Sequence, residues 1–197
     1  MCRATRMGGM DLGLFHAINS LAGQAGWSDR LLAWAAGYLP IALVVLVAGG
    51  WFWPGSREER GQRQRLVVYA VAAALIGLGL AQGIGHVWFR ERPYVHHAAH
   101  LLLAPSHDPS FPSDHAVGGF ALATPFALAR RRLGWVLLGL ATLLCVARVA
   151  VGTHYPSDVL AGALLGTGAG LLVWRCRAWV ERPLAWTLTI ARRWRLA

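Results

Sequence analysis

The chain has 197 residues, of which 56% are hydrophobic and only 14% are charged, and its net charge is +10. Soluble domains carry about a quarter charged residues, so this composition favours an integral membrane protein. All of the positive charge comes from arginine, because the chain contains no lysine. The arginines bracket apolar segments and form no basic stripe, which argues against nucleic acid as a partner. Cys2, Cys145 and Cys176 are scattered and indicate neither a disulfide framework nor a metal site.

The N-terminal residues read as a helix that lies on the membrane surface. Residues 1–15 lack the compact apolar core of a cleavable signal, so we expect the first membrane span to direct insertion. Residues 11–30 place Leu12, Phe15 and Ile18 at helical spacing among polar residues. Such a mixed helix favours the interface between water and lipid, with a sixth, poorly hydrophobic span as the alternative.

Five apolar segments follow and predict an all-α, polytopic membrane bundle. The predicted spans are residues 31–53, 66–89, 113–129, 133–151 and 159–174. The third and fifth are shorter than the usual length of about 20 residues, but a polar motif precedes each and can start its helix in the headgroup region. We therefore expect an interfacial region at 1–30, a membrane-embedded core at 31–177 and a basic tail at 178–197 that forms a second interfacial helix.

The arginine distribution predicts which side of the membrane each loop faces. Residues 54–65, read as a short polar turn, belong to one side together with 130–132 and the tail from 175 onward, and these carry thirteen of the nineteen arginines. Loops rich in arginine stay in the cytoplasm, so the loops after the second and fourth spans face outward. Those two outer loops hold every chemically distinctive motif of the chain.

Three polar patches fall at the outer ends of the predicted helices: RERPY at 90–94, FPSDH at 111–115 and RVAVGTHYPSD at 148–158. Charged groups near lipid are costly unless they meet one another or an anion, so we expect the three patches to converge.

Two of the patches also precede helices, and a helix start attracts anions through its free N–H groups and its dipole. Ser113 or Asp114 is a suitable N-cap for the third span, and Pro156 suits the first turn of the fifth. The planar guanidinium groups of Arg92 and Arg148 match phosphate oxygens. The patches therefore predict a phosphate-binding site at the outer membrane surface.

Two histidines have distinct predicted tasks at that site. His154 lies four residues before Asp158, which can accept a hydrogen bond from one ring nitrogen and leave the other free to attack phosphorus. His115 can protonate the departing oxygen. The chemistry is then phosphoryl transfer through a phosphohistidine. It requires no metal or other cofactor, because arginines and amides supply the positive charge.

Other motifs have simpler interpretations. Gly162 and Gly166, four residues apart, predict a helix-packing face. The histidines of the loop after the second span lack paired ligand spacing on a clear helix, so we favour a solvated loop over a metal site; they are His96, His97, His100 and His107.

The pattern resembles the type 2 phosphatidic acid phosphatase superfamily, whose signature is Lys-x6-Arg-Pro, Pro-Ser-Gly-His and Ser-Arg-x5-His-x3-Asp. Arg92-Pro93 matches the end of the first block, residues 112–115 match the second with Asp114 in place of Gly, and residues 147–158 match the third with Ala147 in place of Ser. The resemblance covers residues from about 31 to 174.

This resemblance implies a helical membrane bundle in which His154 is the nucleophile, His115 the general acid and Asp158 the residue that orients His154. It places Arg92, Arg148 and Ser113 on the phosphate, and we add Asp114 to the phosphate-binding set; contact of Asp114 with a second phosphate or with His115 is open. The family lysine is replaced by Gly85. Either Arg90 supplies that cation or the site has one phosphate ligand fewer.

The FPSDH variant, the THYPSDVLAG run and the early FHAINSLAG pattern resemble the bacitracin-resistance type of undecaprenyl-diphosphatase. This implies hydrolysis of undecaprenyl pyrophosphate to the monophosphate at the outer face of a bacterial inner membrane. The alternatives are a related phosphatase acting on phosphatidic acid or phosphatidylglycerol phosphate, a non-catalytic lipid-phosphate carrier, and a metal-binding protein that uses the loop histidines.

Overall fold

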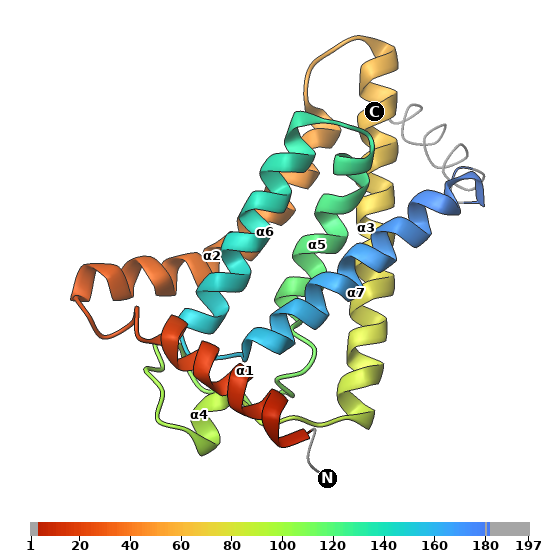
Figure 1. The fold of residues 1–197 in the computed structure, drawn as a ribbon. Coiled ribbons are helices and arrows are strands. Elements are labelled where there is room, and N and C mark those ends of the chain that lie inside the picture. The colour runs from red at the N-terminus through yellow and green to blue at the C-terminus, as the bar shows by residue number, and fades with distance from the viewer. Residues whose placement is uncertain (1–3, 180, 182–197) are drawn as a thin grey trace.

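The computed structural model describes residues 4–179 and 181, which form seven α-helices and no strand (Figure 1). In chain order these are α1 (Ala4–Asn19), α2 (Gly26–Phe52), α3 (Arg57–Val87), α4 (Pro93–His96), α5 (Asp114–Leu128), α6 (Arg132–Ala150) and α7 (Pro156–Arg175). The all-α prediction is confirmed. The predicted tail helix at 178–197 lies almost wholly outside the described residues.

Four of the helices are long and apolar enough to cross a membrane: α2, α3, α6 and α7. The helix α5 has only 15 residues, and at about 1.5 Å per residue it is shorter than the hydrocarbon core. It packs against α2, α3, α6 and α7, so its neighbours shield it from lipid. The predicted third span therefore exists as an inner helix of the bundle.

The helices α5 and α7 pack closely, because glycines allow the two backbones to approach. A Cβ atom added at Gly162 would lie 2.6 Å from the Ser113 carbonyl oxygen, and one at Gly166 would lie 2.3 Å from the Val117 carbonyl oxygen. Neither position has room for a side chain. The predicted glycine packing face is confirmed, and it fixes the start of α5 against α7.

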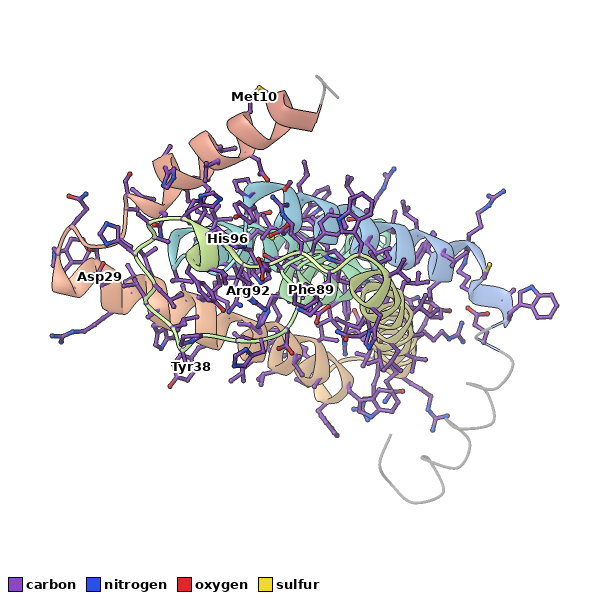
Figure 2. The ribbon with its side chains drawn as sticks, turned by 90° about the horizontal axis from the view of Figure 1, so that it is seen from below. Met10, Asp29, Tyr38, Phe89, Arg92 and His96 are labelled. Carbon is purple, nitrogen blue, oxygen red and sulfur yellow. The ribbon has the colours of Figure 1, made fainter. Side chains whose placement is uncertain are left out.

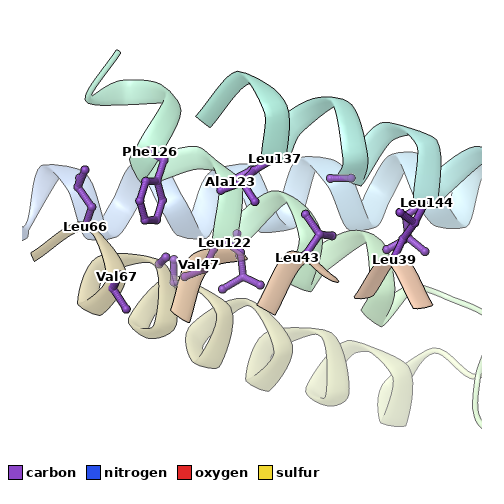
Figure 3. Packing of buried hydrophobic residues seen from close by; sticks show 14 of the residues in the cluster. Leu39, Leu43, Val47, Leu66, Val67, Leu122, Ala123, Phe126, Leu137 and Leu144 are labelled. Carbon is purple, nitrogen blue, oxygen red and sulfur yellow. The ribbon is translucent and has the colours of Figure 1, made fainter. Parts of the chain in front are cut away.

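A hydrophobic core fills the bundle between α2, α3, α5 and α6 (Figure 3). Phe126, Leu137 and Leu43 are among its largest buried side chains, each at most 1% exposed. Large apolar side chains also cover the outer faces of the long helices, among them Val45, Leu75, Leu143, Leu164 and Leu172. Because a soluble protein rarely exposes so much apolar surface, these faces contact lipid. The protein is a multi-pass membrane protein.

The predicted boundaries are close for α5, α6 and α7, whereas α2 begins at Gly26 and not at residue 31, and α3 begins well before residue 66. The polar turn expected at 54–65 is mostly helical, because α3 begins at Arg57. Ser56 accepts a hydrogen bond from the Glu59 amide, and the Glu59 carboxylate accepts one from the Ser56 amide. This capping box starts the helix two turns before the apolar segment. In α2 the helix changes direction about midway (Figure 1), as Pro40 inside it predicts.

The first helix lies across one end of the bundle and does not run along it (Figure 1). With 16 residues α1 is too short to span, which favours an interfacial helix. The bounds predicted for that helix, 11–30, are wrong, because α1 ends at Asn19 and α2 already begins at Gly26. The same end carries α4 and the loops that hold the three polar patches. The opposite end carries the α2–α3 and α5–α6 connections, the start of α3 and the end of α7, where most of the arginines in the described residues lie.

Candidate active site

The loop between α6 and α7 folds back tightly and brings Arg148 and His154 together. Gly152 has a φ of +84°, a left-handed conformation that suits glycine at a helix end. Thr153 then donates twice to the Arg148 carbonyl, from its amide at 3.2 Å and from its hydroxyl at 2.8 Å. The chain reaches His154 directly above the last turn of α6, and α7 begins at Pro156 as predicted.

The imidazole of His154 is held by different partners on its two sides. Its Nδ1 lies 2.9 Å from the Ser110 carbonyl oxygen, which can only accept, so Nδ1 carries the proton. Its Nε2 lies 3.3 Å from Nη1 of Arg92 and 3.4 Å from Nη2 of Arg148. Guanidinium groups only donate, so Nε2 presents its lone pair to them. The nitrogen that is free to attack therefore points between two cations.

Burial lowers the pKa of the His154 imidazole well below its usual range, and the charges of Arg148 and Arg92 lower it further. Both effects disfavour the protonated ring. The hydrogen bond to the Ser110 carbonyl favours protonation but does not reverse the direction. His154 is thus neutral at physiological pH, the state that a nucleophilic nitrogen requires.

The two arginines differ in how many of their donors are used. Arg92 donates from Nε to the Asp108 carbonyl at 3.1 Å and from Nη1 to the Thr153 carbonyl at 3.0 Å, and it lies toward the middle of the bundle (Figure 2). In the described part of the chain, the buried Nε of Arg148 and the buried hydroxyl of Ser113 have no hydrogen-bond partner. Buried polar groups are normally paired, so these two atoms fit a ligand rich in acceptors, such as phosphate.

Ser113 occupies the predicted N-cap position of α5, but its hydroxyl makes no cap bond. Its amide donates instead to the Asp158 carbonyl at 3.1 Å, which ties the start of α5 to the first turn of α7. The first intrahelical bond of α5 runs from the Val117 amide to the Ser113 carbonyl. The preceding amides, at residues 114–116, therefore remain available to an anion at the positive end of the helix dipole.

His115 lies close enough to Arg148 and Arg92 for their charges to act on it, and it acts in turn on His154. The structure thus brings the two histidines to the same cluster of cations, as predicted. The neighbouring Asp114 is half-buried and accepts a hydrogen bond from Nε2 of Gln82 in α3 at 2.7 Å. This carboxylate therefore links the start of α5 to α3.

The expected direct hydrogen bond between His154 and Asp158 is not formed. The Asp158 Oδ2 atom lies 3.9 Å from Nδ1 of His154, because Ser110 stands between them. The Ser110 hydroxyl donates to Oδ2 at 2.6 Å, while its carbonyl takes the ring proton. Asp158 also accepts from the Tyr155 amide at 2.8 Å and is fully buried. It acts on the ring through Ser110.

Arg90 does not take the place of the family lysine as a free phosphate ligand. Its guanidinium group donates to Asp158 at 2.6 Å, to Ser157 at 2.7 Å and to Asp11 of α1 at 2.8 Å. At the lysine position, a Cβ atom on Gly85 would lie 3.1 Å from the Pro109 ring. The loop that carries Ser110 thus occupies that space, and the geometry favours a site with one cation fewer.

Sequence reasoning missed three residues that border the site. Ser110 stands directly before the FPSDH motif, and its position next to a motif made of functional residues was the available signal. Thr153 lies inside the third patch and could have been recognised as a partner for a helix end. Asp11 gave no local signal, because its role depends on where α1 crosses the bundle.

An apolar groove of about 340 Å³ runs along α5, between α2, α3 and α6. Among its described lining residues, Asp114 and His115 are the polar ones, and they stand at the site end of α5. Val44 and Leu75 line the groove and are also exposed on the outer surface of the bundle, 55% and 68% respectively. The groove therefore connects Asp114 and His115, at the start of α5, with the lipid-facing surface.

The family model described as the PAP2 superfamily matches residues 65–182. The chain belongs to the PAP2 superfamily. This region contains all seven residues predicted for the site and leaves out only α1, α2, the start of α3 and the tail. The resemblance seen in the three motifs is confirmed.

Two relatives are similar to this chain over most of their length. The chain is 31% identical to undecaprenyl-diphosphatase BcrC of Bacillus subtilis over 166 residues, which covers 84% of this chain and 83% of that protein. It is 33% identical to the putative undecaprenyl-diphosphatase YbjG of Escherichia coli over 159 residues, covering 80% and 77%.

Two solved structures share the fold. Aquifex aeolicus LpxE superimposes with a TM-score of 0.67 at 24% identity, covering 84% of this chain and 95% of that one. A transmembrane PAP2-type phosphatidylglycerolphosphate phosphatase from Bacillus subtilis gives 0.55 at 22% identity, covering 87% and 86%. At this identity the likeness concerns the arrangement of the helices.

Proposed function

We propose that the protein hydrolyses undecaprenyl pyrophosphate to undecaprenyl phosphate and inorganic phosphate through a phosphohistidine at His154. One observation carries this proposal: the unprotonated Nε2 of His154 lies between the buried guanidinium groups of Arg92 and Arg148. An uncharged nucleophile held within a cluster of cations is suited to attack an anion that the same cations bind.

In the first half-reaction the terminal phosphate sits against Arg92, Arg148 and the hydroxyl of Ser113. Nε2 of His154 attacks phosphorus, a P–N bond forms, and the P–O bond to the lipid monophosphate breaks. His115, which the charge of the bound pyrophosphate holds in its protonated form, donates its proton to the departing oxygen. Nδ1–H stays on the Ser110 carbonyl and supports the positive charge that develops on the ring.

In the second half-reaction water attacks the phosphorus of the phosphohistidine. His115, now neutral, accepts a proton from that water, the P–N bond breaks, and Nε2 of His154 regains its lone pair. Inorganic phosphate leaves, and the charges of Arg92 and Arg148 remain in place throughout.

The apolar groove supports a substrate with a long hydrocarbon tail. It extends along α5 from His115 to Leu122, roughly 10 Å at the rise of a helix, and it opens toward the bilayer. A lipid whose headgroup enters the cation cluster can lay the first part of its tail in this groove. The names of the BcrC and YbjG relatives favour a polyprenyl pyrophosphate as that lipid.

We further propose that the site faces the periplasm or the outside of a bacterial inner membrane. The support is the separation in Figure 1: α1, α4 and the site loops lie at one end of the bundle, and the arginine-rich connections lie at the other. Arginine-rich ends remain cytoplasmic, so the site end is exported.

The test is phosphate release by purified protein in detergent from undecaprenyl pyrophosphate, phosphatidic acid and phosphatidylglycerol phosphate, with His154→Ala beside the wild type. We expect the pyrophosphate to be the fastest substrate and the variant to lose about three or more orders of magnitude. Equal rates with a chelator present are also expected, because arginines supply the positive charge.

Faster hydrolysis of either monophosphate ester would replace the proposed substrate by the corresponding lipid. A carrier without catalysis predicts no turnover by the wild type and full retention of cellular function by His154→Ala. Inhibition by the chelator would support the metal-binding alternative.

A further inference from the structure

The N-terminal helix α1 reaches the candidate site through one carboxylate, that of Asp11. Its Oδ2 atom accepts a hydrogen bond from Nη2 of Arg90 at 2.8 Å and one from the Ser157 hydroxyl at 2.6 Å. Its Oδ1 atom accepts one from the Ser157 amide at 3.0 Å. A residue 146 positions away in the chain from Ser157 thus receives two of the bonds that hold the first turn of α7.

Arg90 continues this network to the buried carboxylate of the site. Its Nη1 atom donates to Oδ1 of Asp158 at 2.6 Å, and its guanidinium group lies over the Tyr155 ring at 4.0 Å from the centroid. The side chain of Asp158 is 0% exposed, whereas those of Asp11 and Arg90 are 13% and 30% exposed. A fully buried carboxylate is stable only when it is paired and fully hydrogen-bonded.

The opposite charges of Asp11 and Arg90 stabilise each other. Burial acts to raise the pKa of Asp11, but the hydrogen bonds from Ser157 and Arg90 outweigh it and the net direction is down. Burial acts to lower the pKa of Arg90, but the hydrogen bond to Asp11 and the charge of Asp158 outweigh it and the net direction is up. A guanidinium group that bridges two carboxylates in this way has a fixed orientation.

We propose that Asp11 is a positioning residue, which fixes Arg90 against Asp158 and so sets the ring of His154 through Ser110. The helix α1 is then part of the catalytic unit. This inference rests on the proposed function, because it assigns a role in the same phosphoryl transfer. Each link in the path is a contact within hydrogen-bond distance.

The docking of α1 does not depend on Asp11 alone, which makes the proposal testable. Phe15 is 0% exposed and packs in a cluster with Tyr155 and Val149. Asn19 donates to the carbonyls of His100 at 3.0 Å and Ala150 at 2.8 Å. These contacts persist when Asp11 loses its charge, so Asp11→Asn removes the positioning without removing the helix.

The experiment is a double-mutant cycle on the full-length protein in detergent, with Asp11→Asn, Arg90→Lys and the double variant. In the wild-type background Asp11→Asn lowers kcat about tenfold and changes KM less than about twofold, since the phosphate and tail contacts remain. In the Arg90→Lys background the same substitution costs less than about twofold, because an ammonium group does not bridge both carboxylates. Asp11→Glu restores most of the lost kcat.

Asp29→Asn is the matched control, because that carboxylate accepts from the Gly23 amide at the exposed start of α2 and lies outside the network. It leaves kcat and KM at wild-type values. An equal tenfold loss from Asp11→Asn in both Arg90 backgrounds would show that Asp11 acts only by anchoring α7 through Ser157, and it would overturn the proposal.

The same double-mutant cycle is also measured by the melting temperatures of the four proteins, which tests the coupling even if a variant loses activity. Coupling between Asp11 and Arg90 in the melting temperature supports the bridge, and additive shifts overturn it. If the wild type releases phosphate but the effects of the two substitutions on kcat are additive, this inference alone is wrong. A wild type that releases phosphate from no lipid defeats the proposed function, and the inference with it.

Discussion

At the scale of single residues, the proton on Nδ1 of His154 determines that Nε2 is the ring nitrogen with a free lone pair. It is fixed by a carbonyl oxygen, that of Ser110, and not by the carboxylate of Asp158. A carbonyl cannot change its protonation state, so the tautomer is the same at every pH at which the ring is neutral. The lone pair at Nε2 remains directed at Arg92 and Arg148.

The depressed pKa of His154 predicts the acid side of the pH profile. The free ring must be neutral to attack, and an ordinary imidazole gains its proton below pH of about 6.5. Because burial and the arginine charges lower the pKa of His154, kcat/KM holds its value through pH of about 6.5 and declines only at lower pH. Measurement of kcat/KM between about pH 4 and pH 8 checks this. An acid limb above pH of about 6.5 would contradict the assignment.

Because the buried Nε of Arg148 has no hydrogen-bond partner in the described structure, we expect activity to require this donor as well as the positive charge. Arg148→Lys keeps the charge but removes the Nε donor and the planar fork. We expect kcat/KM to fall by about 30-fold or more, since hydrogen bonds to charged groups contribute roughly 1.5–3 kcal/mol. Arg57→Lys at the far end of the bundle is the matched control. Wild-type activity in the Arg148→Lys variant would show that Arg148 contributes charge only.

At the scale of helices, the site depends on how closely α5 and α7 approach. Gly166→Ala places a Cβ atom 2.3 Å from the Val117 carbonyl oxygen, so the helices must separate. Overpacking of this kind costs about 1–3 kcal/mol, and we expect a lower unfolding temperature together with lower kcat. Gly168→Ala, with no atom within 4 Å of the added Cβ, is the control. Equal stability of both variants would contradict the packing argument.

Most of the long helices could be predicted because hydropathy reports membrane insertion directly. The polar helix ends were misplaced: the capping box at Ser56 extends α3 beyond the apolar segment, and the N-terminal helix is Ala4–Asn19 and not 11–30. The three motifs predicted that His154, Arg148 and Arg92 would converge, and the structure brings the two guanidinium groups to the His154 ring. The mediating position of Ser110 could not be predicted, because a loop residue gains its role only when distant helices converge.

At the scale of the whole molecule, the proposed function depends on which side of the membrane the site faces. The contacts of Asp11 could not be predicted from the sequence around it, because its partners Arg90 and Ser157 come from two other segments of the chain. The arginine distribution, in contrast, is a global property of the sequence, and the fold gathers the arginine-rich loops at one end. Their shared end could therefore be predicted, whereas the network of α1 required the structure.

This sidedness predicts the labelling pattern of single cysteines. In a background with the other cysteines removed, a cysteine replacing the exposed His107 at the site end reacts with a membrane-impermeant maleimide in intact spheroplasts. The exposed Cys176 at the opposite end reacts only after lysis. The reverse pattern would place the site in the cytoplasm and contradict the proposed orientation.

The most direct test of the central claim is to trap and map the phosphoenzyme. Undecaprenyl pyrophosphate labelled in its terminal phosphate is mixed with purified protein, the reaction is quenched in alkali, and the labelled peptide is sequenced. We expect the labelled phosphoryl group on Nε2 of His154, because Nδ1 is bound to the Ser110 carbonyl. Label on Nδ1 of His154 or on any other residue, His115 included, would contradict it.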